Sequence, residues 1–142
     1  MRYPILSLIG GASATAGVAT DSTGDKYVFA IPFKCKVRKV FGIVQGTSTN
    51  ATNFVIKFDK RPTAGGEGSR GDGDVGAITK GASNRQGKML YEIPSTAVTL
   101  KEGEECVAEV TTANGDACAT WVGIELEYIP EEPSNNSNMV SA

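Results

Sequence analysis

The sequence has no histidine among its 142 residues. Histidine is the commonest general base and metal ligand near neutral pH, so its absence excludes Ser-His-Asp and Cys-His catalysis and any imidazole-based metal site. The chain also lacks an apolar run long enough to cross a bilayer. We therefore expect a soluble protein that is not an enzyme, binds no cofactor or metal and does not insert into a membrane.

Cysteine is scarce as well, with Cys35, Cys106 and Cys118 as its only occurrences. An odd number of cysteines argues against a disulfide framework. Cys35 and Cys106 occupy apolar positions of expected strands, where a free thiol acts as a small hydrophobic group. We expect both thiols to be buried and the chain to fold in a reducing compartment.

Helical periodicity is missing too. Short runs of alternating apolar and polar residues are separated by segments rich in glycine, threonine and serine, and glycine occurs 17 times. This pattern predicts an all-β fold, a two-sheet antiparallel sandwich of the jelly-roll type. The expected strands are Tyr3–Ile9, Lys26–Ile31, Cys35–Gln45, Asn53–Asp59, Val75–Thr79, Lys88–Ile93, Val98–Leu100, Glu104–Thr112 and Ala117–Ile129.

The expected domain spans residues 26–129. Residues 1–25 form an expected amino-terminal strand or arm with a connector, because Gly10–Gly24 has almost no large side chain to contribute to a core. Residues 130–142 are a polar tail interrupted by proline. We expect the arm and the tail to extend from the sandwich.

Two segments carry the clearest strand patterns. Glu104–Thr112 and Ala117–Ile129 alternate with a period of two around an Asn-Gly-Asp turn, which predicts a β-hairpin that pairs Cys106 with Ile124 and Ala108 with Val122. In Cys35–Gln45, the same alternation predicts that Cys35, Val37, Phe41 and Ile43 share one face of a strand.

The charge is divided unevenly along the chain. Residues 1–90 hold thirteen Lys and Arg against six Asp and Glu, and residues 91–142 hold one against ten. The two halves either pair within one sandwich or attract an oppositely charged partner. The basic run Lys34, Lys36, Arg38 and Lys39 could follow phosphates, but without interleaved aromatic residues we expect a salt-bridged face and no nucleic-acid binding.

The longest irregular segment is Arg61 to Lys88, with eight glycines. Long loops in compact domains usually bind partners or are disordered. Asp72 and Asp74 could bind calcium, although the other ligands are missing from the pattern. We predict a mixed-charge loop that contacts a partner. The expected interface residues are Arg61, Arg70, Asp72, Asp74, Arg85, Trp121, Glu125 and Glu127.

The chain resembles small β-sandwich virion proteins of tailed bacteriophages, of the head-decoration or cement type. The likeness lies in Phe29–Val37 (FAIPFKCKV), where a strand ends at a proline before a long strand, and in Val98–Glu104 (VTLKEGE), a turn before a Thr- and Ala-rich segment. The resemblance implies a non-enzymatic protein on the capsid surface, made in the host cytoplasm. It also implies contacts with the major capsid protein or another shell protein, and a homo-oligomer, with a trimer favoured.

Two other functions stay open. A carbohydrate- or receptor-binding sandwich could use Trp121 and Tyr128 to stack on sugars, supported by Asp72 and Asp74. A trimeric nucleotide hydrolase similar to dUTPase has a comparable length, but the stretch from Gly71 to Gly76 departs from the motifs of those enzymes.

Overall fold

The computed structural model describes residues 4–12, 17–44, 53–61, 73–81, 89–113 and 120–130, which form nine strands. None of these residues belongs to a helix long and apolar enough to cross a membrane. The strands are β1 (Ile5–Gly10), β2 (Gly24–Ala30), β3 (Cys35–Val44), β4 (Phe54–Arg61), β5 (Gly76–Lys80), β6 (Met89–Glu92), β7 (Val98–Leu100), β8 (Glu105–Thr112) and β9 (Thr120–Tyr128).

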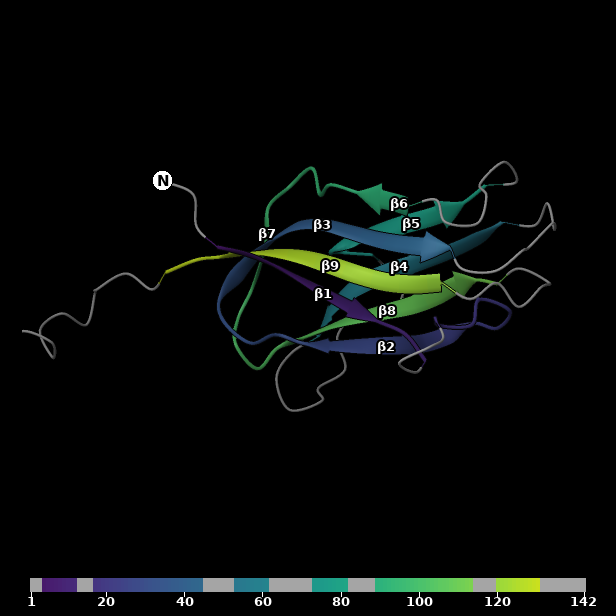
Figure 1. Cartoon of the computed structure of the whole chain (residues 1–142), viewed down its shortest axis with the longest axis horizontal. Coiled ribbons are helices and arrows are strands. Elements are labelled where there is room, and N and C mark those ends of the chain that lie inside the picture. The colour runs from purple at the N-terminus through teal and green to yellow at the C-terminus, as the bar shows by residue number, and fades with distance from the viewer. Residues whose placement is uncertain are drawn as a thin grey trace, which may run out of the picture.

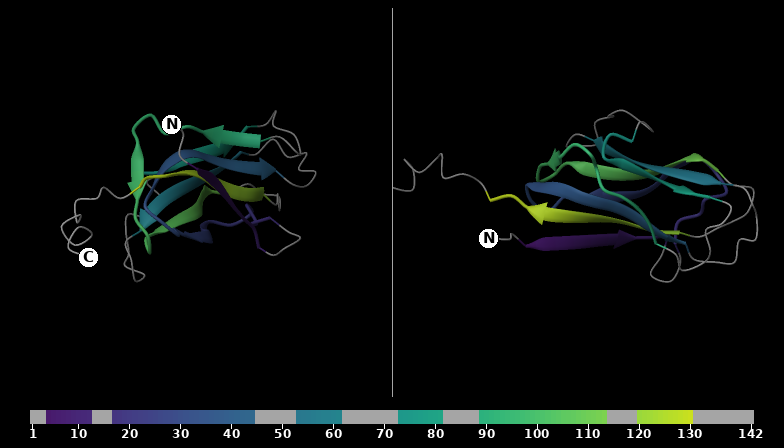
Figure 2. Two further views of the ribbon diagram at one scale, coloured as in Figure 1. Left: turned by 60° about the vertical axis from the view of Figure 1, so that its left-hand side comes forward. Right: turned by 90° about the horizontal axis from the view of Figure 1, so that it is seen from above.

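The strands form two antiparallel sheets packed face to face (Figures 1 and 2). The first sheet has the order β1-β9-β3-β6, with β7 also paired to β3, and the second has the order β2-β8-β4-β5. The pairs are nested: β1 pairs with β9, β2 with β8, β3 with β6 and β7, and β4 with β5. Such nesting arises when one long hairpin is folded over into two sheets, so the fold is a jelly roll.

The core lies between the sheets and follows the predicted alternation. Phe54, Ile56 and Phe58 of β4 are fully buried, as are Val122 and Ile124 of β9. Burying one face of a strand hides every second side chain, which is why a period of two located strands such as β4 and β9. The fold class and the strands predicted from the sequence are confirmed.

The predicted hairpin between β8 and β9 is wrong. β8 lies in the second sheet, where Cys106 pairs with Phe29 and Lys60, and β9 lies in the first sheet, where Ile124 pairs with Leu8 and Val40. Figure 1 shows the two strands in different layers. Their apolar rows face each other across the core, and alternation alone cannot distinguish this arrangement from a hairpin that shares one face.

The predicted faces of β3 are also wrong beyond Val37. The pairing of β3 with β9 shifts between Val37 and Lys39 at a β-bulge. A bulge adds one residue to a strand and reverses the facing of the residues after it. Val40 and Val44 therefore point into the core, whereas Phe41 and Ile43 point to the outer face of the first sheet.

The amino-terminal segment forms a strand, which is one of the two alternatives expected for it, and not an arm outside the sandwich. β1 is an edge strand of the first sheet, with six residue pairs to β9. Val18, in the expected connector, is buried and exchanges two backbone hydrogen bonds of 2.9 Å with Thr120. Residues 5–10 and 17–20 therefore belong to the sandwich. The expected tail lies outside the described residues from position 131 onward.

Candidate functional site

The outer face of the first sheet carries apolar side chains that no described element covers. In one row across the strands, Ile9 lies opposite Gly123, Gly123 opposite Phe41, and Phe41 opposite Tyr91. In the next row, Trp121 lies opposite Ile43 and Ile43 opposite Met89. Five of the eight large exposed apolar residues in the described ranges lie on or beside this face: Ile5 (47% exposed), Ile9 (55%), Met89 (42%), Tyr91 (61%) and Ile93 (66%). We call the two rows together with Ile93 the apolar face, and Ile5 lies apart from it, beyond the row of Ser7, Glu125 and Lys39.

The centre of the apolar face is held by Phe41 and Gly123. A Cβ atom on Gly123 would overlap the Phe41 ring, so the ring lies directly on the glycine backbone. Phe41 is only 5% exposed although it points away from the core. Gly123 thus leaves the space that the Phe41 ring occupies, and the more exposed Tyr91 and Ile9 lie on the two sides of this pair.

A charged row borders the apolar face. Arg38 Nη1 donates to Glu127 Oε1 at 2.6 Å, and Lys39 Nζ lies 3.5 Å from Glu125 Oε2. Lys39 Nζ also lies 5.8 Å from the ring centroids of both Phe41 and Tyr91, within the range of cation–π contacts. Lys39 therefore contacts both the charged row and the two aromatic rings of the apolar face.

These ion pairs explain the uneven charge of the sequence. The pairs of Arg38 and Lys39 with the β9 glutamates, and that of Lys60 with Glu104, all join a cation of residues 1–90 to a carboxylate of residues 91–142. The basic strand and the acidic strand are neighbours in one sheet. The interpretation that the two halves pair within one sandwich is confirmed for these residues.

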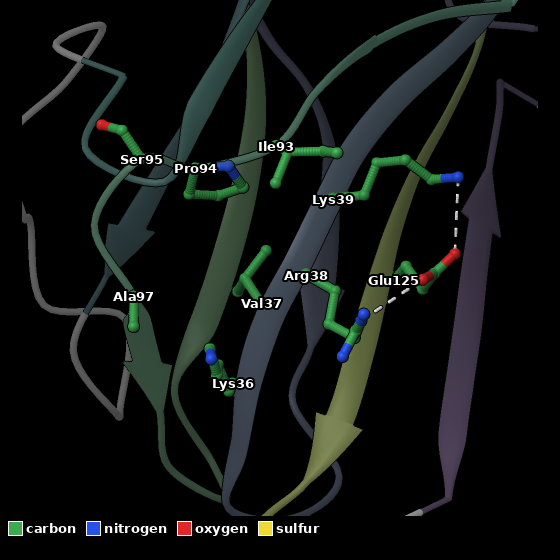
Figure 3. A pocket seen from close by; sticks show the side chains of 9 residues that line it. All are labelled: Lys36, Val37, Arg38, Lys39, Ile93, Pro94, Ser95, Ala97 and Glu125. Atoms are coloured by element: carbon green, nitrogen blue, oxygen red, sulfur yellow. Dashed lines mark ion pairs between the residues drawn. The ribbon is translucent and has the colours of Figure 1, made fainter. Parts of the chain in front are cut away.

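A cleft of about 440 Å³ opens beside the charged row (Figure 3). β3 pairs with β7 through Cys35–Val37 and with β6 through Val40–Ile43, so Arg38 and Lys39 belong to neither ladder. The segment between β6 and β7 forms the opposite wall. The cleft is lined by Lys36, Val37, Arg38, Lys39, Ile93, Pro94, Ser95, Ala97 and Glu125.

The predicted interface residues do not gather in one place. Trp121, Glu125 and Glu127 lie on the outer face of β9, whereas Arg61 is on β4 and Asp74 precedes β5, both in the second sheet. Arg70, Asp72 and Arg85 fall outside the described residues. Within the predicted Arg61–Lys88 loop the structure describes Arg61 and residues 73–81, which include strand β5.

Arg61 belongs to an intramolecular ionic cluster on the second sheet. Its Nη1 and Nη2 donate to the two oxygens of Asp25 at 2.9 and 2.8 Å. The hydrogen bond to Asp25 raises the pKa of Arg61. Burial opposes this rise, and the negative charges of Asp25, Asp59 and Glu109 add to it. Burial first, then the charges of Asp25 and Asp59, raise the pKa of Glu109. Arg61 therefore neutralises carboxylates of its own chain.

Asp74 has a local structural role. Its Oδ1 accepts a hydrogen bond of 2.8 Å from the backbone N–H of Lys60, and Asp59 Oδ1 accepts one of 2.8 Å from Gly73. These bonds fasten the start of β5 to β4. Among the described residues, no group of three or more His, Cys, Asp or Glu is placed to hold a metal ion.

The expected sugar platform of Trp121 and Tyr128 is not formed by the two side chains together. They lie seven residues apart on one strand, about 23 Å at the usual rise per residue, and have opposite parity. Tyr128 contacts Phe33 edge to face with ring centroids 5.4 Å apart, at the end of the sandwich. Trp121 lies on the outer face opposite Ile43.

The sequence prediction missed the exposed residues of β6 and Ile93 just after it, which dominate the apolar face. Met89, Tyr91 and Ile93 share one parity, while Leu90 on the other parity is buried in the core. The available signal was that the expected strand Lys88–Ile93 has apolar residues on both parities. On a strand that ends at Pro94, this pattern indicates one face in the core and one face left exposed.

No protein-family model and no curated protein matches the sequence. Among solved structures, the fold is similar to Eiger TNF from S. frugiperda, with a TM-score of 0.42, 11% sequence identity, and coverage of 92% of this chain and 98% of that chain.

Proposed function

We propose that this chain is a non-enzymatic structural protein of a virion, a decoration or cement protein that attaches to the capsid shell through the apolar face. The observation that carries the proposal is that face. It places the strongly exposed Tyr91, Ile93 and Ile9 on one side of the sandwich. The outer faces of antiparallel sheets are usually polar, and large contiguous apolar patches on soluble proteins mark interaction sites.

The composition of the face also supports a protein partner. Tyr, Trp, Met and Arg are enriched at the centres of protein interfaces. Tyr91, Trp121, Met89 and Arg38 lie together on or beside this face. Aromatic rings already held by Gly123 and Lys39 lose little conformational freedom on binding, which favours affinity.

The partner in this proposal is the major capsid protein or another shell protein, and the chain acts as a homo-oligomer, with a trimer favoured. The capsid surface is the site of action and the host cytoplasm the site of synthesis. The two free, buried thiols Cys35 and Cys106 suit folding in a reducing compartment.

Purified virions of the phage that encodes the chain provide the test. We expect mass spectrometry to find the chain in the particles in a fixed ratio to the major capsid protein, and particles made without its gene to lose their contents more readily on osmotic shock. Absence of the chain from purified particles would exclude the proposal. Sedimentation velocity of the isolated chain separately tests the expected trimer.

A further inference from the structure

The cleft beside Arg38 has the dimensions and the charge of a small-ligand site. Its volume of about 440 Å³ lies in the range common for such sites. β6 and β7 pair with β3 on either side of it, so Arg38 and Lys39 are the two β3 residues between the ladders. A gap this short does not admit an extended peptide as an added strand, and a compact ligand fits it better.

The charge of the cleft favours an anion. Lys36, Arg38 and Lys39 line it, and the two glutamates that pair with Arg38 and Lys39 compensate two of these three positive charges. Lys36 is exposed and makes no ion pair with any described residue. One positive charge is therefore left for a ligand.

Arg38 has N–H donors that its hydrogen bond to Glu127 does not use. It reaches Glu127 through Nη1 at 2.6 Å and approaches Glu125 through Nε at 3.9 Å. Its Nη2 donates no hydrogen bond to a described residue. A guanidinium group offers planar N–H pairs that match the two oxygens of a carboxylate. Nη2 of Arg38 and the ammonium group of Lys36 are the donors available for such a group.

The opposite wall is apolar. Ile93 is 66% exposed, and Figure 3 shows its side chain extending toward Lys39 across the cleft, next to Pro94. Tyr91 continues this surface, since Lys39 Nζ lies 5.8 Å from its ring centroid. A ligand that fits both walls has an anionic group on one side and a C–H surface on the other. A sugar ring that bears a carboxylate combines the two.

We infer that the cleft between β3 and the β6–β7 segment binds a carboxylated sugar, with Lys36 and Arg38 holding the carboxylate and Ile93 and Pro94 packing against the ring. This site differs from the Trp121–Tyr128 platform expected from the sequence. The cleft shares Ile93 with the apolar face, so a chain attached to a capsid shell through that face would not bind the sugar at the same time, and the isolated chain is the form to test.

The experiment is a titration of the ¹⁵N-labelled chain with D-glucuronate, followed by amide chemical shifts. We expect saturable shifts centred on Arg38, Lys39 and Ser95, and none of comparable size with D-glucose or acetate. Lys36→Ala should weaken glucuronate binding about tenfold, the effect of losing one charge-assisted hydrogen bond. Ile93→Ala should weaken it without changing its dependence on salt.

Lys101→Ala is the matched control, because it removes an exposed lysine away from the cleft, and it should bind glucuronate as the wild type does. The proposal is overturned if glucose binds equally well, if Lys101→Ala loses as much affinity as Lys36→Ala, or if nothing saturates. Stronger binding of an N-acetylglutamate amide than of glucuronate would also overturn it, and would assign the cleft to an acidic protein partner.

Discussion

The ring of Phe41 lies directly on the backbone of Gly123, on the outer surface of the first sheet. This contact results from the bulge between Val37 and Lys39, which turns Phe41 out of the core. Because Gly123 has no side chain, a large aromatic ring can be almost fully covered at a position that faces away from the core. The apolar face depends on this pair.

Gly123→Ala should destabilise the protein by about 1–3 kcal/mol, the usual cost of forcing extra atoms into a packed site. The added methyl group would overlap the Phe41 ring and displace it. Urea unfolding measures the change. In a Phe41→Leu background the same substitution should cost less, since the clash is relieved. Equal costs in both backgrounds would contradict the contact.

Arg61→Ala should cost about 2–3 kcal/mol, below the range for fully buried ion pairs because Asp25 is partly exposed. The substitution leaves Asp25 and Glu109 without their cation. Lys60→Ala is the matched control from the same strand. Its pair with Glu104, at 3.5 Å, is more exposed, and it should cost less than about 1 kcal/mol. Urea unfolding measures both variants. Equal losses of unfolding free energy for Arg61→Ala and Lys60→Ala would contradict a stabilising role of the Arg61–Asp25 pair.

Glu109 should make the protein less stable as the pH rises. Its pKa is raised in the folded state, so its contribution to folding is complete below about pH 4.5, the ordinary value for Glu, and is lost as the pH rises through the folded-state pKa. Its Oε2 is buried without a hydrogen-bond partner in the described part of the chain. Glu109→Gln should therefore be more stable than the wild type at pH 7.

The measurement is the free energy of unfolding between pH 4 and 8 for Glu109→Gln and for Glu105→Gln. The control removes the same charge from the same strand and face. A gain confined to Glu109→Gln, increasing with pH, is the expected result. A gain of equal size in both variants would point to a general effect of net charge.

The thiols of Cys35 and Cys106 should be unreactive in the folded protein. Burial raises the pKa of both, to about 11 for Cys35, where Glu104 adds to the effect, and further for Cys106. Since the thiolate is the reactive form, a disulfide reagent at pH 8 should modify neither in a Cys118→Ala variant, and both after unfolding. Modification of the folded variant at the rate of free cysteine would refute this.

The sequence was sufficient for the strands, the fold class and most of the core, but not for the core residues Val18, Val40 and Val44. Burial of one face imposes alternation on segments such as Phe54–Phe58, and enough such segments without helices leave few alternatives to a sandwich. It was not sufficient for the pairing of β8 with β9, because strands in opposite sheets and strands in a hairpin have the same apolar parity. Only contacts distant in the sequence, such as those of β1 with β9, decide between them.

The candidate site was harder to predict from the sequence than the fold. The bulge is marked in the sequence only by Arg38 and Lys39, two consecutive charged residues that interrupt the alternation between Val37 and Val40. The prediction continued the alternation through them and so assigned Phe41 and Ile43 to the wrong face. Trp121, Glu125 and Glu127, which the sequence predicted at an interface, lie on the outer face of β9. Their neighbours were not foreseen, since Tyr91 and Met89 reach this face only through the pairing of β6 with β3.

The most direct test of the apolar face is co-sedimentation of the purified chain with capsid shells that lack it. The wild type and Thr79→Glu, a control on the outer face of the second sheet, should bind the shells equally well. Tyr91→Glu, which keeps the core intact but puts a charge on the apolar face, should not sediment with them. Binding of Tyr91→Glu at the wild-type level, or failure of the wild type to bind, would contradict the account.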